Sequence, residues 1–144
     1  MSDKLYYNIN DISDKYYLGW DSVYIQCIKI AEDIKSKYDL DKVNLIGVAR
    51  GGMIPVTIVS HQLGLRFQML DLHSYTDKES GDMVVENQLK LNKDKVNIII
   101  DDIYDTGKTF EYINSHYQID KFYYVLDKRD RDYGWVVFPW ESEE

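Results

Sequence analysis

The stretch Ile98-Ile99-Ile100-Asp101-Asp102-Ile103-Tyr104-Asp105-Thr106-Gly107-Lys108-Thr109 decides the fold of this 144-residue chain. Its apolar, β-branched start is typical of a strand that is buried within a parallel sheet. The residues from Thr106 to Thr109 are typical of the start of a helix. Acids at the carboxyl end of such a strand can hold sugar hydroxyls or a metal ion, and the N–H groups of the following loop can hold a phosphate. A ligand with both a phosphate and a ribose diol would satisfy both parts.

Helical and extended patterns alternate along the rest of the chain, which predicts a mostly parallel α/β sheet flanked by helices in a single domain over residues 1–144. Residues 75–92 are polar and are predicted to form a mobile loop, or a loose hairpin with residues 83–91 on one arm. Within a C-terminal tail at about 127–141, the aromatic residues 135–140 are predicted to be extended. The other expected elements are a helix from Trp20 to about Tyr38 with Asp21 as its N-cap, strands at 43–48, 67–73, 96–100 and 122–126, a helix with Pro55 in its first turn that ends before Gly64, and a helix at 106–116.

Composition restricts the classes of function. Hydrophobic residues at 44% and aromatic residues at 14% are typical of a folded globule. The net charge of −8, without a basic cluster, disfavours nucleic-acid binding. Cys27 is the only cysteine, so the chain cannot form an internal disulfide; we expect a buried thiol in a reducing cytoplasm. The sequence contains neither a signal-peptide pattern nor an apolar stretch long enough to cross a bilayer, so no membrane partner is expected.

The acidic stretch matches neither the P-loop spacing nor the Rossmann glycine pattern. It resembles the phosphoribosyl pyrophosphate (PRPP) signature of the type I phosphoribosyltransferases, which is an apolar strand, two acids, two further residues and then Asp-Thr-Gly-x-Thr. The alternative is a buried strand that ends in a solvated, Asp-rich turn.

This resemblance implies a role for each residue of the signature. Asp101 and Asp102 would contact the ribose hydroxyls of PRPP and help to position Mg²⁺, directly or through water. Asp105 would face N7 of a purine and exchange a proton with it. The residues that would cradle the 5′-phosphate are Asp105, Thr106, Gly107, Lys108 and Thr109, although the Lys108 side chain can equally face solvent.

Arg50-Gly51-Gly52 follows one predicted strand and precedes a helix. Glycines let a backbone approach an anion closely, and Arg supplies a planar charged fork. In the family this position is the pyrophosphate-binding loop, so the resemblance assigns Arg50 and Gly51 to pyrophosphate and implies a non-proline cis peptide between Ala49 and Arg50. The alternative is an ordinary strand-to-helix turn with a surface arginine.

The resemblance continues in segments 20–21, 47–55 and 135–141, which are similar to the bacterial xanthine–guanine phosphoribosyltransferases. It implies that Lys128 donates to the exocyclic O6 of the base, that Trp135 stacks on the ring, and that the backbone around Val136 reads the other edge. Ser74-Tyr75 would open a flexible loop over the site. Alternatively, Lys128 only begins a solvated charged run, Lys128 to Asp132. Glu141 lies near the position of an acid that is associated with a second metal ion in relatives.

The sequence departs from the family in the 75–92 loop, which has no arginine for pyrophosphate; Lys78 or Lys90 are the available substitutes. The charged run after Lys128 also differs from the bacterial pattern. The predicted function is Mg²⁺-dependent transfer of the phosphoribosyl group of PRPP to N9 of guanine, xanthine or hypoxanthine, by a homo-oligomer that is either a dimer or a tetramer. The alternatives are a PRPP- or nucleotide-binding regulator and a transferase for another base, such as a pyrimidine.

Overall fold

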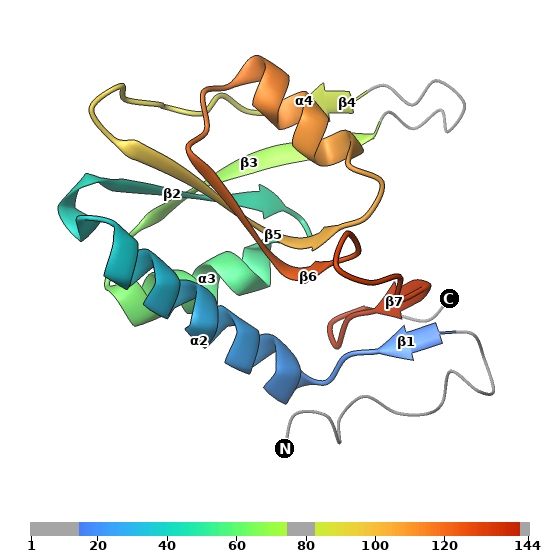
Figure 1. Ribbon diagram of the computed structural model, residues 1–144. Helices are drawn as coiled ribbons and strands as arrows, with labels where there is room; N and C mark the ends of the chain where they lie inside the picture. The colour runs from blue at the N-terminus through green and yellow to red at the C-terminus, as the bar shows by residue number, and fades with distance from the viewer. Residues whose placement is uncertain (1–14, 75–82, 142–144) are drawn as a thin grey trace.

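The computed structural model describes residues 15–74 and 83–141, and its centre is a five-stranded sheet in the order β4-β3-β2-β5-β6 (Figure 1). The strands β2, β3, β5 and β6 are parallel to one another, and only the edge strand β4 is antiparallel. This confirms the predicted α/β fold. The sheet consists of β2 (Val43–Ala49), β3 (Phe67–Ser74), β4 (Met83–Val85), β5 (Val96–Tyr104) and β6 (Lys121–Asp127).

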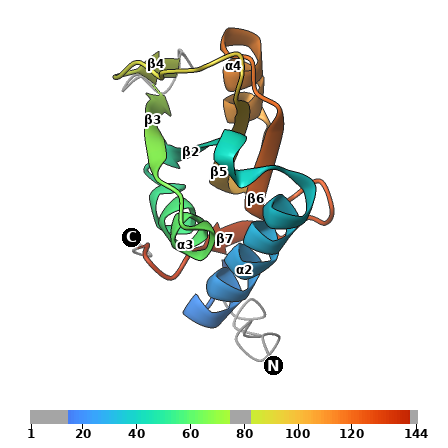
Figure 2. The same cartoon turned by 90° about the vertical axis from the view of Figure 1, so that its left-hand side faces the viewer.

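Helices cover both faces of the sheet, as the view in Figure 2 shows. One face carries α2 (Trp20–Lys37) and α3 (Met53–Leu63), and the other carries α4 (Lys108–His116). A short 3-10 helix, η2 (Leu40–Lys42), joins α2 to β2. Within the described segments no helix has the length and apolar character needed to cross a membrane.

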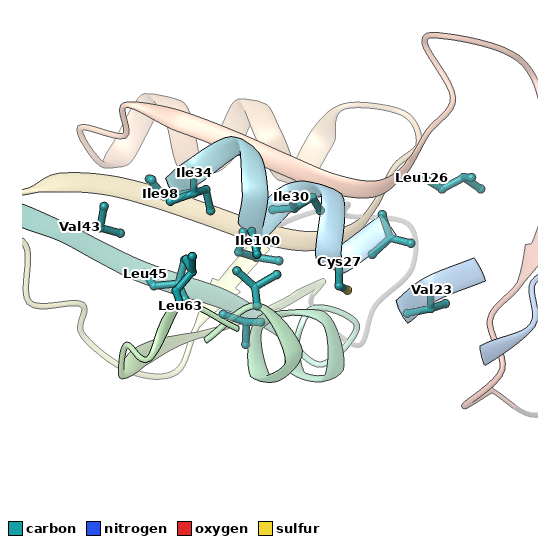
Figure 3. Close-up of a cluster of buried hydrophobic side chains, with 14 of the residues drawn as sticks. Val23, Cys27, Ile30, Ile34, Val43, Leu45, Leu63, Ile98, Ile100 and Leu126 are labelled. Carbon is teal, nitrogen blue, oxygen red and sulfur yellow. The ribbon is translucent and has the colours of Figure 1, made fainter. Parts of the chain in front are cut away.

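Alternate residues of the central strands divide the core between these two layers. Ile98 and Ile100 of β5 point to α2 and α3, where Cys27 and Ile34 pack against them (Figure 3). Ile99, between them in sequence, packs on the α4 side against Ile113. This alternation explains the continuous apolar run of β5, because both faces of the strand are buried. Cys27 is fully buried, as predicted.

Several predicted boundaries need correction. The first helix begins at Trp20 with Gly19 as its N-cap, so Asp21 lies in the first turn, where its charge favours the helix dipole, and does not cap the helix. β5 continues to Tyr104, so both adjacent acids lie within the strand. The helix α3 ends before Gly64, as predicted, and Gly64 adopts the left-handed conformation with φ at +67°.

A second, two-stranded sheet holds the C-terminal tail. Here β7 (Trp135–Val137) pairs in parallel with β1 (Lys15–Tyr17), a strand that the sequence analysis did not predict. Of the polar segment 75–92, residues 83–85 form β4, which pairs with β3 rather than with another part of the segment, and residues 75–82 lie outside the described residues. The tail strand β7 follows β6 and the turn at 128–134, and this places it at the carboxyl edge of the main sheet (Figure 1).

Candidate active site at the carboxyl edge of the sheet

The predicted site residues meet where the strand order reverses. From β2 the chain passes through α3 to β3 on one side, and from β5 it passes through α4 to β6 on the other. The helices α3 and α4 lie on opposite faces, so the loops after β2 and β5 diverge and leave a crevice between them. Ligands of open α/β sheets bind at such a switch point. The loop after β2 carries Arg50, and the loop after β5 carries Asp105.

Asp101 and Asp102 differ in their surroundings. Asp101 is 6% exposed, and its Oδ1 accepts a hydrogen bond of 2.8 Å from the Asp102 amide. Burial, and then the negative charge of Asp102, raise the pKa of Asp101 well above the ordinary range. The pKa of Asp102 is also raised by burial, with Glu141 as a nearby negative charge. Asp102 is the more available carboxylate, because it borders three hollows at this edge of the sheet.

The loop after β5, which the sequence analysis predicts to cradle a phosphate, leads directly into α4. Gly107 has φ at +92°, a conformation that favours glycine, and it is the N-cap of α4. Residues 101–110 and Tyr124 line a hollow of about 140 Å³ at this loop. The first amides of α4 point out of the helix N-terminus without intrahelical acceptors, as an anion site requires. The Thr106 hydroxyl lies 3.4 Å from the Lys108 amide, and the Lys108 side chain is exposed.

The loop after β2 lies against Asp102. A Cβ atom on Gly51 would collide with the Asp102 carboxylate, so a larger residue here would force that carboxylate to move. The Ala49–Arg50 peptide is cis, as the resemblance implies. Arg50 and Gly51 share a hollow of about 530 Å³ with Asp102, Trp140 and Glu141. This hollow therefore combines a guanidinium with two carboxylates, which suits an anion that arrives with a cation.

Lys128 and Asp105 form an ion pair across the mouth of the site. Lys128 Nζ lies 3.0 Å from Asp105 Oδ1, and the Lys128 side chain is only 19% exposed. The Lys128 amide donates to the Tyr104 carbonyl, so the first residue after β6 is tied to the last residue of β5. The solvated-run interpretation is therefore wrong for Lys128. The next residue, Arg129, is more exposed and pairs with Asp127 at 2.7 Å.

The C-terminal tail closes the remaining side. Trp135, at 70% exposure, borders a hollow of about 270 Å³ together with Val136, Asp105 and Lys128. An aromatic ring this exposed beside a polar pair is available for stacking. Glu141, at the end of the tail, accepts a hydrogen bond of 2.9 Å from the Phe138 amide and lines the same hollow.

Ser74 ends β3, and Tyr75 lies outside the described residues, so the loop contact that the resemblance implies stays a prediction. The sequence analysis missed two aromatic residues at the site. Tyr104 and Tyr124 line the hollow at the loop after β5, and their rings meet edge to face with centroids 5.5 Å apart. The position of Tyr104 inside the acidic signature was the one available signal.

A model of the phosphoribosyl transferase domain matches residues 15–140, which include every element described above. The chain belongs to this family. The phosphoribosyltransferase fold recurs in a purine phosphoribosyltransferase from Pyrococcus horikoshii Ot3, which is 28% identical with a TM-score of 0.71 over 91% of this chain and 97% of that one.

Two further phosphoribosyltransferase-like structures share the fold at lower identity. The Helicobacter pylori xanthine-guanine-hypoxanthine phosphoribosyltransferase is 17% identical, with a TM-score of 0.67 over 90% of this chain and 95% of that one. A Neisseria gonorrhoeae hypothetical protein with bound ppGpp is 14% identical, with a TM-score of 0.62 over 90% of each chain. The family assignment confirms the resemblance that the PRPP signature carried.

Proposed function

We propose that this chain transfers the 5-phosphoribosyl group of PRPP to N9 of a 6-oxopurine, either guanine, xanthine or hypoxanthine, with release of pyrophosphate. The observation that carries this proposal is the Lys128–Asp105 pair, whose charged atoms lie 3.0 Å apart beside the exposed ring of Trp135. In a 6-oxopurine O6 and N7 lie on the same edge of the ring. A cation for O6 and a carboxylate for a proton on N7 match that edge.

The same pair argues against adenine. Adenine has an amino group, a hydrogen-bond donor, where a 6-oxopurine has a keto oxygen, and an ammonium group has three donors and no acceptor. The ammonium group of Lys128, which has no acceptor, would therefore face the amino group of adenine, which is a donor. The Pyrococcus and Helicobacter relatives are described as purine and xanthine-guanine-hypoxanthine transferases, which supports a purine as the acceptor.

The reaction would begin with PRPP across the crevice, its 5′-phosphate on the loop at 105–109 and its pyrophosphate near Arg50. The bond between C1′ and the pyrophosphate oxygen breaks, and the leaving group takes the electron pair. N9 of the base attacks C1′ while Asp105 accepts the proton from N7. Positive charge on the ribose rises during this step, so positioning and electrostatic stabilisation supply most of the rate enhancement.

Mg²⁺ fits the oxygen donors at this edge. Asp102 borders the hollows on either side, and within the described residues no three His, Cys, Asp or Glu side chains converge on one point. Mg²⁺ commonly binds one or two carboxylates and completes its shell with substrate oxygens and water. When bound, the ion would neutralise the pyrophosphate charge. We propose Asp102 as its direct ligand and buried Asp101 as the group that orients Asp102 through its backbone amide.

The test is the initial rate of pyrophosphate release from PRPP and Mg²⁺ with guanine, xanthine, hypoxanthine, adenine and uracil offered separately. We expect release with one or more 6-oxopurines, little with adenine or uracil, and none after chelation of the metal. Asp105→Asn should reduce kcat far more than it weakens PRPP binding. Release with uracil alone would instead favour the transferase for another base. Sedimentation of the same sample tests the expected homo-oligomer.

A regulatory protein is the second candidate. The Neisseria protein with bound ppGpp shows that the same fold can hold a phosphorylated guanine nucleotide. Against this alternative, Asp105, Lys128 and Trp135 are all present around one hollow here. PRPP or nucleotide binding without pyrophosphate release, with any base of the panel, would favour the regulator.

A further inference from the structure

Tyr104, the last residue of β5, places its phenol group against the phosphate loop. A Cβ atom on Gly107 would lie 2.5 Å from the Tyr104 hydroxyl oxygen, so the hydroxyl rests directly on the loop. The same residue lines the hollow of about 140 Å³ that the loop surrounds. Among residues 15–74 and 83–141 this hydroxyl has no hydrogen-bond partner. The side chain is half-buried and lines the hollow, so its hydroxyl is available to donate to a group that binds there.

The ring of Tyr104 is held on several sides. The rings of Phe110 and Tyr124 pack against it, with centroids 5.9 Å and 5.5 Å away. The guanidinium carbon of Arg129 lies 3.8 Å from the ring centroid, the distance of a close cation–π contact. Asp127 fixes that guanidinium through Nη2–Oδ2 and Nε–Oδ1 contacts of 2.7 Å and 3.0 Å. The hydroxyl is therefore preorganised, because the ring that carries it cannot turn freely.

We propose that the Tyr104 hydroxyl is a further ligand of the 5′-phosphate and that Arg129 is the positioning residue that keeps it on the loop. The inference rests on the proposed function, because it presumes a ligand with a 5′-phosphate at this loop. This proposal also gives the two basic residues after β6 separate places. Lys128 pairs with Asp105 beside the proposed base site, and Arg129 packs on the Tyr104 ring beside the proposed phosphate site. An added donor is useful in a chain with a net charge of −8, which repels a multiply charged phosphate.

Tyr104→Phe tests the ligand, because it removes the hydroxyl and retains the ring under Arg129. Calorimetry would measure the Kd of GMP, guanosine and PRPP with Mg²⁺. We expect the Kd of GMP and of PRPP to rise about tenfold, as for a lost hydrogen bond to a charged group. The Kd of guanosine, which has no phosphate, should not change. In the steady state, the KM for PRPP should rise with kcat retained. The matched control is Tyr112→Phe, in the helix α4 that follows the loop.

Arg129→Lys tests the positioning role, since it retains the charge and loses the planar group over the ring. We expect a smaller rise in the Kd of GMP, and no additional rise when it is combined with Tyr104→Phe, because Arg129 acts through the hydroxyl. Equal Kd values for GMP in the parent and Tyr104→Phe would overturn the inference alone, provided that the parent binds GMP and releases pyrophosphate. A parent that binds neither GMP nor PRPP would overturn the inference and the proposed function together.

Discussion

Replacement of Lys128 by methionine is the sharpest single test of the base site. The change keeps an unbranched side chain in a pocket where Lys128 is only 19% exposed and removes the ammonium that lies 3.0 Å from Asp105. A hydrogen bond to a charged group contributes about 1.5–3 kcal/mol, so the loss of the contact to O6 should lower kcat/KM for guanine by about 10- to 150-fold. The ratio of kcat/KM for guanine to kcat/KM for adenine should fall by a similar factor.

Stability should change much less than activity. Asp105 is 57% exposed, and an ion pair with so exposed a partner contributes less than about 1 kcal/mol to the free energy of unfolding. The matched control is Lys37→Met, which removes a similar pair, Lys37 Nζ to Asp33 Oδ1 at 3.1 Å, at the far end of α2. Steady-state kinetics and urea unfolding of both variants separate the two effects. If kcat/KM for guanine fell no further in Lys128→Met than in Lys37→Met, the assignment of Lys128 to the base would be refuted.

Three further predictions concern residues buried or packed near the site. Gly51→Ala should lower kcat/KM strongly and reduce the free energy of unfolding by about 1–3 kcal/mol, because the new Cβ collides with the Asp102 carboxylate. The control is Gly64→Ala, whose new Cβ meets no atom within 4 Å but strains the left-handed backbone. It should reduce the free energy of unfolding and leave kcat/KM unchanged. Because burial raises the pKa of Asp101, the folded state holds the proton of this carboxyl more tightly than the unfolded state does, so stability falls as pH rises above the ordinary pKa of Asp. Asp101→Asn should therefore stabilise the fold at pH 7 and not at pH 3. Equal effects at both pH values in denaturant titrations would contradict this prediction. Burial raises the pKa of the Cys27 thiol to about 12, so iodoacetamide at pH 8 should label Cys27 only in denaturant, and rapid labelling of the native protein would count against the core assignment.

The sequence predicted the elements whose side chains repeat with a clear period. The apolar run at β5 and the end of α3 before Gly64 were identified from local patterns alone, and the structure confirms both. β1 was missed because three residues are too short to show alternation, and its pairing partner Trp135–Val137 lies at the other end of the chain. A contact between such distant segments leaves no local signal.

The parts of the site that lie in recognisable motifs were predictable from sequence, and the parts that depend on contacts made by the fold were not. The end of β5 was placed too early because charged residues usually leave a strand, whereas Asp101 and Asp102 accept hydrogen bonds from the backbone amides that follow them. The charged run after β6 could not be divided from sequence, since both Lys128 and Arg129 are basic and only the fold decides which carboxylate each one meets. Tyr104 escaped notice because the contact of its hydroxyl with the loop depends on the fold around Gly107.

The most direct test of the central claim is the identity and amount of the products formed from PRPP, Mg²⁺ and a 6-oxopurine. Chromatography with mass detection should find the nucleoside 5′-monophosphate of guanine, xanthine or hypoxanthine in equal amount to the pyrophosphate released. If none of these bases gave a nucleotide from a sample that still binds PRPP, the account of this chain as a 6-oxopurine phosphoribosyltransferase would be contradicted.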